Sequence, residues 1–354
     1  MKFGIFSDIH IHPFNAFSKI NADGINTRLL ETVETLEKIL DGAQKNKCDF
    51  VLFCGDMWHV KKIDAITLDL TMRALQKTQI PIILIPGNHE EMDALGKFHA
   101  TRVLRGRVQI LDHHDGLTTK INGLRIAGIP YAKNQDIKKL MTDYKGYDVL
   151  MLHTGITGAL MGADFIADEE SISLNDLQDA IGLVTAGHFH QSQLFTDQVY
   201  LPDGAEENYT RKIIPGKTVL IPGAPLQHGF GDEGSVRGWW LCDDLKTLSF
   251  QPINAPKFLK LLGSDIKNGL NGLDLSQVYA TIISEDGKID EQTAHELRGL
   301  KMIVEKKETK AEQRMSIDTS TSADDIIAAY VERMGKGDKQ QLIRTGKDIL
   351  NENQ

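Results

Sequence analysis

Two histidines stand one residue apart in "TAGHFHQ", residues 185–191, where an apolar run ends. Side chains two positions apart in an extended segment point to the same side, so the rings of His188 and His190 can share one space. Imidazole is a common metal ligand, although on these residues alone an ordinary loop is the alternative. The pair raises the question of whether further ligands stand elsewhere in the chain.

Four other apolar runs also end in residues that can bind metal ions. The runs "KFGIF", "DFVLFCG", "IPIILIPG" and "YDVLML" lead into Asp8 and His10, into Asp56, into Asn88 with His89, and into His153. Each residue alone could be a helix cap, a turn residue or a buried histidine with satisfied hydrogen bonds. Their repeated position at the ends of apolar runs favours one shared site.

The candidate ligands share one property, which is that they offer nitrogen and oxygen atoms and no thiolate. They are Asp8, His10, Asp56, Asn88, His153, His188 and His190. This mixture suits Mn²⁺, Fe²⁺ or Zn²⁺ better than a site for Mg²⁺ or Ca²⁺, which would be nearly all oxygen. Seven ligands are too many for one ion, and two ions about 3.5 to 4 Å apart are a common device for hydrolysing phosphate esters.

The apolar runs that precede these ligands are typical of buried strands, and helical patterns lie between them. Apolar residues fall on one helical face between Leu29 and Ala43, and a second amphipathic pattern covers residues 64–76. Strands that alternate with helices predict an α/β fold with a largely parallel sheet. Its active residues should collect at the carboxyl ends of the strands.

From residue 117 onward, turns rather than long helices separate the strand signals. These signals are "LTTKINGLRIAGIP", "KTVLIPGAP", "VRGWWLCDD" and "LSFQPIN". They predict a second, mostly antiparallel sheet packed against the first. The sequence then divides into residues 1–255 as the main domain, 256–308 as a small strand, helix, strand domain, 309–320 as a polar linker, and 321–354 as two short amphipathic helices.

The composition is that of an ordinary globular protein, with 41% hydrophobic and 25% charged residues among 354. The net charge of −9 argues against a protein that binds nucleic acid over a broad basic surface. Cys48, Cys54 and Cys242 form no CxxC pair, which favours reduced thiols. The start "MKFGIFSDIH" does not resemble a signal peptide and no apolar run reaches about 18 residues, so we expect a cytoplasmic protein without a membrane span.

Read in order, "SDIH", "GDMWH", "PGNHE", "LHTG" and "GHFH" resemble the five motifs of the calcineurin-like metallophosphoesterase superfamily. The resemblance implies a four-layer α/β/β/α sandwich with two metal ions. The implied ligands of the first ion are Asp8, His10, Asp56 and His190. Those of the second ion are Asp56, Asn88, His153 and His188, so Asp56 would bridge the two ions.

Within the superfamily, the chain resembles the SbcD family of nuclease subunits of SbcCD-type DNA repair complexes. "GDMWH" lacks the arginine of the phosphatase motif GDxxDRG, and "VLIPGAPLQHGFGDEGSVRGWW" is similar to the Gly-Ser-Pro block of SbcD. The resemblance implies a Mn²⁺-dependent (or Mg²⁺-dependent) DNA exonuclease and endonuclease that cuts duplex ends and single strands. His89 and His59 would be its catalytic histidines beside the metal ions.

The same resemblance implies a homodimer, a capping domain over residues 256–308, and a helical tail that docks on an SbcC-type coiled-coil ATPase. Three features depart from the family. His12 stands in "DIHIH", where the family has leucine and glycine after its first histidine, Ala224 replaces a common serine, and the tail is short. The resemblance also allows a compact viral form, which would work in the host cytoplasm.

Two other functions agree with the motifs. One is a stand-alone phosphomonoesterase or cyclic-nucleotide phosphodiesterase, which would have little use for a capping domain and a docking tail. The other is a non-catalytic scaffold of the same fold. Scaffolds of that kind usually lose ligands, whereas every ligand position is filled here.

Overall fold

A computed structural model describes residues 1–92, 98–132, 134–144, 146–162, 165–166, 172–173, 176, 182–196, 199–201, 210–263, 266–297, 300–306, 331 and 342–345. One compact unit comprises Met1–Ser284 and Lys288–Glu305, and Glu285–Gly287 with Lys306–Gln354 form the other. The expected linker, 309–320, lies outside the described residues. So does most of the expected docking segment, 321–354.

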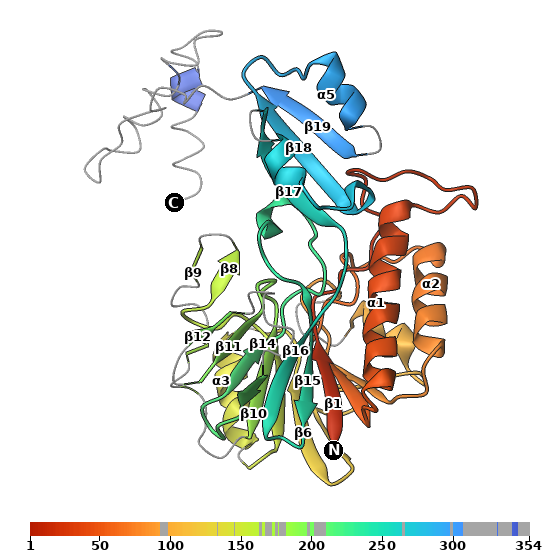
Figure 1. The fold of residues 1–354 in the computed structure, drawn as a ribbon. Helices are drawn as coiled ribbons and strands as arrows, with labels where there is room; N and C mark the ends of the chain where they lie inside the picture. The colour runs from red at the N-terminus through yellow and green to blue at the C-terminus, as the bar shows by residue number, and fades with distance from the viewer. Residues whose placement is uncertain are drawn as a thin grey trace. The chain divides into compact units, whose positions relative to one another are not determined.

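Two seven-stranded sheets form the larger part of the first unit (Figure 1). In order across the first sheet, the strands are β13 (Thr210–Lys212), β16 (Thr247–Pro252), β15 (Gly238–Asp243), β1 (Lys2–Phe6), β2 (Phe50–Phe53), β3 (Ile82–Leu84) and β4 (Gln109–Ile110). In the second they are β12 (Val199–Tyr200), β11 (Gln193–Phe195), β14 (Val219–Ile221), β10 (Leu183–Gly187), β7 (Val149–His153), β6 (Leu124–Ile129) and β5 (Thr118–Ile121). A short hairpin joins β8 (Leu160–Gly162) to β9 (Phe165–Ile166).

The arrangement of strands corrects two expectations. The strands β7 and β10 belong to the second sheet, while β15 and β16 complete the first, where β15 runs antiparallel to β1. The second sheet is also parallel at its centre, over β6, β7, β10 and β14, and antiparallel only at its edges. Apolar runs reveal that a strand is buried, but not which neighbour it pairs with, because both sheets are covered on both faces.

Helices cover the outer face of each sheet and complete four layers. The helices α1 (Thr27–Lys45) and α2 (Ala65–Gln76) pack on the first sheet through one apolar cluster, and α3 (Asn134–Asp143) packs on the second through another. Asn26 and Asp64 cap α1 and α2 by accepting backbone N–H bonds. Both predicted helices are therefore confirmed, as is the α/β/β/α sandwich.

The core between the two sheets comes from alternate residues of the buried strands. Phe3, Ile5, Phe50 and Leu52 face the second sheet, while Phe6 belongs to the cluster under the helices. Phe3 stacks on Phe50 with ring centroids 4.8 Å apart. This two-sided packing holds β1 and β2 rigidly, so the loops that leave their carboxyl ends begin from fixed points.

A third sheet of three strands follows the sandwich, and we call residues 256–306 the cap module. It contains β17 (Lys257–Leu262), α4 (Ile266–Leu270), β18 (Val278–Ser284), α5 (Glu291–Glu296) and β19 (Lys301–Lys306). The module adds β17 to the strand, helix, strand unit expected from the sequence, and β17 pairs in parallel with β18. No helix in the part of the chain that the structure describes is long and apolar enough to span a bilayer.

Buried contacts attach the cap module to the start of α1. The guanidinium of Arg28, 1% exposed, lies 4.9 Å from the ring of Phe258 and 4.8 Å from that of Tyr279. The hydroxyl of Tyr279 donates to Glu31, and Lys301 pairs with the same carboxylate at 3.3 Å. A buried cation, a carboxylate and aromatic rings thus hold the module against the sandwich.

Candidate metal centre

The candidate ligands follow the carboxyl ends of five strands, and the loops that carry them converge. The loops after β1 and β2 run side by side, since Asp8 N–H donates to the Gly55 carbonyl at 2.9 Å and His10 N–H to that of Asp56 at 3.1 Å. His153, at the end of β7, hydrogen-bonds the Cys54 carbonyl through Nδ1 at 2.7 Å. The two sheets therefore contribute to one site.

The backbone at several of these residues lies in the left-handed region that non-glycine residues rarely occupy. Asp8, His10, Asp56 and His188 have φ angles of 52°, 47°, 61° and 103°. Such conformations cost free energy, and they cluster at functional sites, where the surrounding structure enforces them. Because four of the predicted ligands adopt this backbone conformation, we infer that the loops are constrained for a functional role.

Glycines in the motifs allow the loops to approach one another. A Cβ atom on Gly87 would lie 2.1 Å from Asp56 Oδ1, and one on Gly55 would lie 2.2 Å from His153 Nδ1. No side chain fits at either distance. The glycines of "PGNHE" and "CGD" are therefore required for the carboxylate and the imidazole to reach the site.

The side chains of Asp8, His10 and His190 form a first cluster of potential ligand atoms. His10 Nε2 and His190 Nε2 lie 3.1 Å apart, and the Asp8 carboxylate accepts the His188 backbone N–H at 3.0 Å and 3.1 Å. Asp8 and His10 are buried and His190 is partly exposed. Substrate can thus reach this cluster from one side.

The side chains of Asn88, His153 and His188 form a second cluster. Asn88 Oδ1 lies 3.0 Å from His153 Nε2 and 3.1 Å from His188 Nδ1. Asp56 Oδ2 lies between the two clusters, 3.4 Å from His153 Nε2 and 3.7 Å from His10 Nε2. Potential ligand atoms of Asp8, Asp56 and His153 also lie within 4.8 Å of one another, so the two clusters adjoin at Asp56. The assignment of these side chains to two separate ions, with Asp56 as the bridge, stays a prediction.

The donor atoms fit divalent cations. Burial lowers the pKa of His10 and lowers that of His188 to about 4, so both rings are neutral and offer lone pairs. Burial would also lower the pKa of His153, but the neighbouring Asp56 carboxylate outweighs it and raises this pKa to about 10. A metal ion at this point would replace that proton as the positive charge between imidazole and carboxylate.

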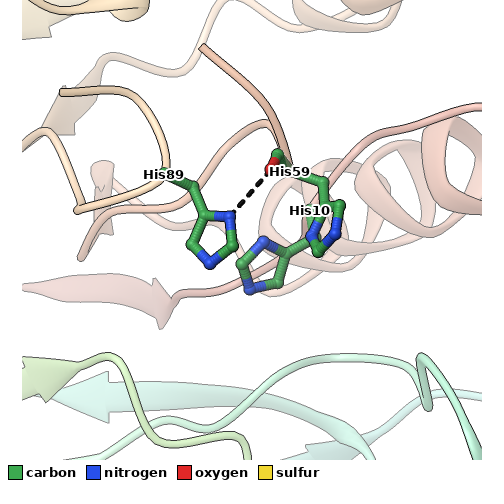
Figure 2. Close-up of side chains that lie close together, drawn as sticks. All are labelled: His10, His59 and His89. Carbon is green, nitrogen blue, oxygen red and sulfur yellow. Dashed lines mark hydrogen bonds between the residues drawn. The ribbon is translucent and has the colours of Figure 1, made fainter. Parts of the chain in front are cut away.

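His89 and His59 lie beside the first cluster (Figure 2). Their rings stack with centroids 4.9 Å apart, and the His10 ring lies 4.6 Å from that of His89. His89 Nδ1–H donates to the backbone carbonyl of His59 at 2.7 Å, which leaves Nε2 as its free ring nitrogen. Both side chains are half-buried, so they can face a substrate as well as the cluster.

Glu90 supports the site but is not among the residues predicted from the sequence, although it follows His89 in the motif. Its buried carboxylate accepts the backbone N–H groups of Asp56, Trp58 and Gly87 at 3.2, 2.9 and 2.8 Å. Burial raises its pKa to about 8. Glu90 therefore ties together the loops that present Asp56 and Asn88, a role that the acidic fifth position of "PGNHE" could have suggested.

A second missed group lies behind the first cluster, in "LQHGFGDEGSVR". Arg237 pairs with Asp232 at 2.9 Å and donates to the His190 carbonyl, and Asp232 lies 3.8 Å from His190 Nδ1. His228 Nε2–H donates to the Asp8 carbonyl at 3.1 Å. At the position where the resemblance expects serine, the backbone N–H of Ala224 donates to the His190 carbonyl at 3.0 Å, a bond that needs no side chain.

The chain has detectable similarity to a curated protein. It is 26% identical over 175 residues to the DNA double-strand break repair protein Mre11 of Methanocaldococcus jannaschii. The match covers 46% of this chain and 46% of that protein, so the chain matches about half of the relative's length.

Solved structures with detectable similarity include two metal-dependent enzymes. One is a metallophosphoesterase from Sphaerobacter thermophilus, 12% identical, with 78% of this chain and 96% of that chain covered and a TM-score of 0.35. The other is a dimetal phosphatase from Danio rerio, 11% identical, with 68% and 91% covered and a TM-score of 0.41.

The family model for calcineurin-like phosphoesterases matches residues 1–192, which is more than half of the chain and spans all five ligand-bearing loops. Members of this family depend on two metal ions, and the two side-chain clusters described above supply candidate ligands for both. The chain therefore belongs to the calcineurin-like phosphoesterase family.

Proposed function

We propose that the protein is a Mn²⁺-dependent DNA exonuclease and endonuclease, the nuclease subunit of an SbcCD-type repair complex. The observation that carries this proposal is the pair of stacked histidines, His59 and His89, next to the first cluster. Neither histidine is needed to complete the two sets of ligands, so both are free to act on a substrate. The similarity to an Mre11 repair protein supports DNA as that substrate.

The chain's own residues would hold the metal ions and position the phosphodiester. Asp8, His10 and His190 would hold the first ion, Asn88, His153 and His188 the second, and Asp56 both. When bound, two divalent ions lower the pKa of water and neutralise charge on the phosphoryl oxygens. Arg237 and Asp232 would keep the His190 imidazole oriented, and Glu90 would keep the Asp56 loop in place.

His89 is proposed to act on the leaving group. Its Nδ1–H is engaged by the His59 carbonyl, so Nε2 is the atom that can hold a proton toward the substrate. As the oxygen of a water molecule bonds to phosphorus and the bond from phosphorus to the leaving oxygen breaks, this proton would pass to the leaving oxygen. His59, stacked on His89, would contact the strand next to the scissile phosphate.

The cap module distinguishes this proposal from an enzyme for small phosphate esters. The module is attached by buried contacts of Tyr279 with Arg28 and Glu31. A substrate that extends beyond one phosphodiester could use such an added surface, whereas a small ester would not need it. The scaffold alternative is less favoured, because all seven ligand side chains converge.

The choice of Mn²⁺ combines the chemistry of the donor atoms with the resemblance to SbcD nucleases. Four imidazoles, two carboxylates and one amide are more nitrogen-rich than a site built for Mg²⁺. Mn²⁺, Fe²⁺ and Zn²⁺ all accept such mixtures, and the resemblance to SbcD implies Mn²⁺ among them, with Mg²⁺ as the alternative.

The partners are also proposed from the resemblance. The protein would form a homodimer, and residues 321–354 would dock on the coiled coil of an SbcC-type ATPase. Such docking would let ATP binding by the partner control the access of duplex DNA to the metal centre, which requires two states of the complex.

A cleavage assay with the purified chain tests the proposal. Labelled linear duplexes, hairpins and circular single strands are incubated with Mn²⁺ or Mg²⁺, with bis(p-nitrophenyl) phosphate as a small diester. We expect Mn²⁺-dependent cleavage of the linear duplex from its ends and of the circular strand internally, and none by the Asp56→Ala variant. Hydrolysis of the small diester without any cleavage of DNA would refute the nuclease function and favour a small-ester phosphodiesterase.

A further inference from the structure

His12 departs from the family pattern and belongs to neither cluster, yet the structure places it next to the catalytic pair. Its ring centroid lies 5.3 Å from that of His59, on which His89 stacks at 4.9 Å. His59 therefore contacts both His12 and His89. The three imidazoles and His10 form one continuous group that begins at the first cluster.

The local backbone explains this position. Ile11 N–H donates to the Met57 carbonyl at 2.8 Å, and Ile11 forms a parallel bridge with Trp58. The loop after β1 thus runs beside the loop after β2, which brings residue 12 next to residue 59. Ile11 is fully buried, and the following side chain in an extended segment points the opposite way, so His12 faces outward.

His12 is also held in place, which distinguishes it from an ordinary surface histidine. Its ring packs edge-on against Phe14 at 5.0 Å, and Phe14 in turn packs on His59 at 5.1 Å. The buried Arg28 guanidinium lies 5.4 Å from the Phe14 ring. The nearby Asp64 carboxylate is occupied by backbone N–H bonds at the start of α2. The half-exposed imidazole therefore has a fixed orientation before any substrate binds.

We propose that His12 is a substrate-binding residue that donates a hydrogen bond to the DNA strand one nucleotide beyond the phosphate at the metal centre. This inference rests on the proposed nuclease function and extends it. His89 and His59 act at the scissile phosphate and next to it, and His12 continues the same row away from the metal ions. An imidazole N–H can donate to phosphate or sugar oxygens, and contacts of this kind set the register of a strand without reading its sequence.

The alternative is that His12 only fills the space next to His59. The two roles differ in how the effect of a substitution depends on substrate length. A spacer acts through His59 and affects every substrate, whereas a residue that contacts the next nucleotide affects only substrates that possess one.

Two substrates separate these roles: thymidine 5′-(p-nitrophenyl) phosphate, which has one nucleoside, and a labelled single strand of ten thymidylates. The variants are His12→Ala, His12→Gly, which carries the family residue, and His12→Gln, which keeps an N–H donor. His114→Ala, in a turn with 62% of the side chain exposed, is the matched control. Thermal unfolding of each variant verifies that it folds.

We expect His12→Ala and His12→Gly to raise KM for the ten-nucleotide strand about tenfold, with kcat changed less than about twofold, because one hydrogen bond to a charged group is lost. Their kcat/KM on the one-nucleoside substrate should match that of wild type. His12→Gln should recover most of the loss, and His114→Ala should behave as wild type.

Equal losses on both substrates, or no loss on either, would overturn the role of His12 while leaving the nuclease function intact. Wild-type protein that hydrolyses the one-nucleoside substrate and not the strand would refute the nuclease function, and the role of His12 with it.

Discussion

The two clusters of the metal centre are built in different ways. The second cluster is held by backbone groups of the motif loops: the Cys54 carbonyl orients His153, and Gly55 makes room for its ring. The first cluster depends on side chains from a distant segment, because Asp232 and Arg237 support His190. The second cluster is therefore oriented by backbone groups of the motif loops themselves, and the first also by side chains from a segment that carries none of the ligands.

This difference implies that the two ions respond differently to substitution. A change in the segment that contains Asp232 and Arg237 should weaken the first position alone. A change at Asp56, which lies between the clusters and which we propose as the bridge, should affect both. Substitution of Asp56 is accordingly the most severe test of the difference between the two clusters.

Substitution of the bridge should have the largest effect. Asp56→Ala should remove both ions and lower phosphodiesterase activity by at least about a thousandfold, because the carboxylate lies between the clusters. Metal content by mass spectrometry and hydrolysis of bis(p-nitrophenyl) phosphate measure the two effects. Asp244→Ala, an exposed carboxylate, is the control. Retention of two bound ions by Asp56→Ala would disprove the bridging role.

Substitution of His89, which we propose to act on the leaving group, should have the next largest effect. His89→Ala should bind Mn²⁺ nearly as wild type and cleave DNA about 10²- to 10⁴-fold more slowly, since general acid catalysis contributes on that scale. Manganese titration followed by electron paramagnetic resonance reports the binding, and single-turnover cleavage reports the rate. Loss of metal in parallel with activity would show that His89 is a ligand.

Substitution of Arg237, which supports His190 in the first cluster, should have a smaller effect, and only on the binding of one ion. Arg237→Ala removes the arginine partner of Asp232 and the donor to the His190 carbonyl, and we expect one of the two Mn²⁺ affinities to fall about 10- to 100-fold. Isothermal titration calorimetry can resolve the two binding events. Arg73→Ala removes an exposed arginine of α2 and serves as the control. If both affinities fall equally, the two clusters are not independent.

Substitution of Glu90 tests the loops that present Asp56 and Asn88, and we expect a smaller effect. Glu90→Gln keeps an oxygen acceptor but turns amide hydrogens toward backbone N–H donors, which should cost about 1 to 3 kcal/mol in the free energy of unfolding. Urea unfolding of the metal-free protein at about pH 9, above the pKa of about 8 that burial gives Glu90, measures this change with the carboxylate ionised. A variant as stable as wild type would mean that Glu90 does not hold these loops together.

Deletion of residues 321–354 should have the smallest effect on the chemistry itself. We expect Mn²⁺-dependent cleavage of short single strands to persist, while co-purification with the ATPase and stimulation by ATP disappear. Pull-down with the partner and cleavage assays with and without ATP make the comparison. Undiminished binding by the truncated chain, or its unfolding, would remove the docking role.

The sequence by itself determined much of this protein, because the signals involved are local. Apolar runs predicted the strands that carry the ligands, and helical periodicity predicted α1 and α2. The residue types at the ends of the runs predicted a nitrogen and oxygen site, and the structure brings those side chains together. A ligand that follows a strand end by one or two residues is close to that strand in the chain. Its position at the end of the strand can therefore be predicted from one short segment.

Only the tertiary structure decided which strands pair and which remote groups support the site. Nothing in "VRGWWLCDD" indicates that β15 pairs with β1, because an antiparallel partner is chosen by the packing of both faces. The contact of Arg237 with His190 and of His12 with His59 depends on how separate loops fold over one another. The sequence of one such segment contains no signal that identifies the segment it will contact. These contacts form only when the two sheets pack together and bring the loops side by side.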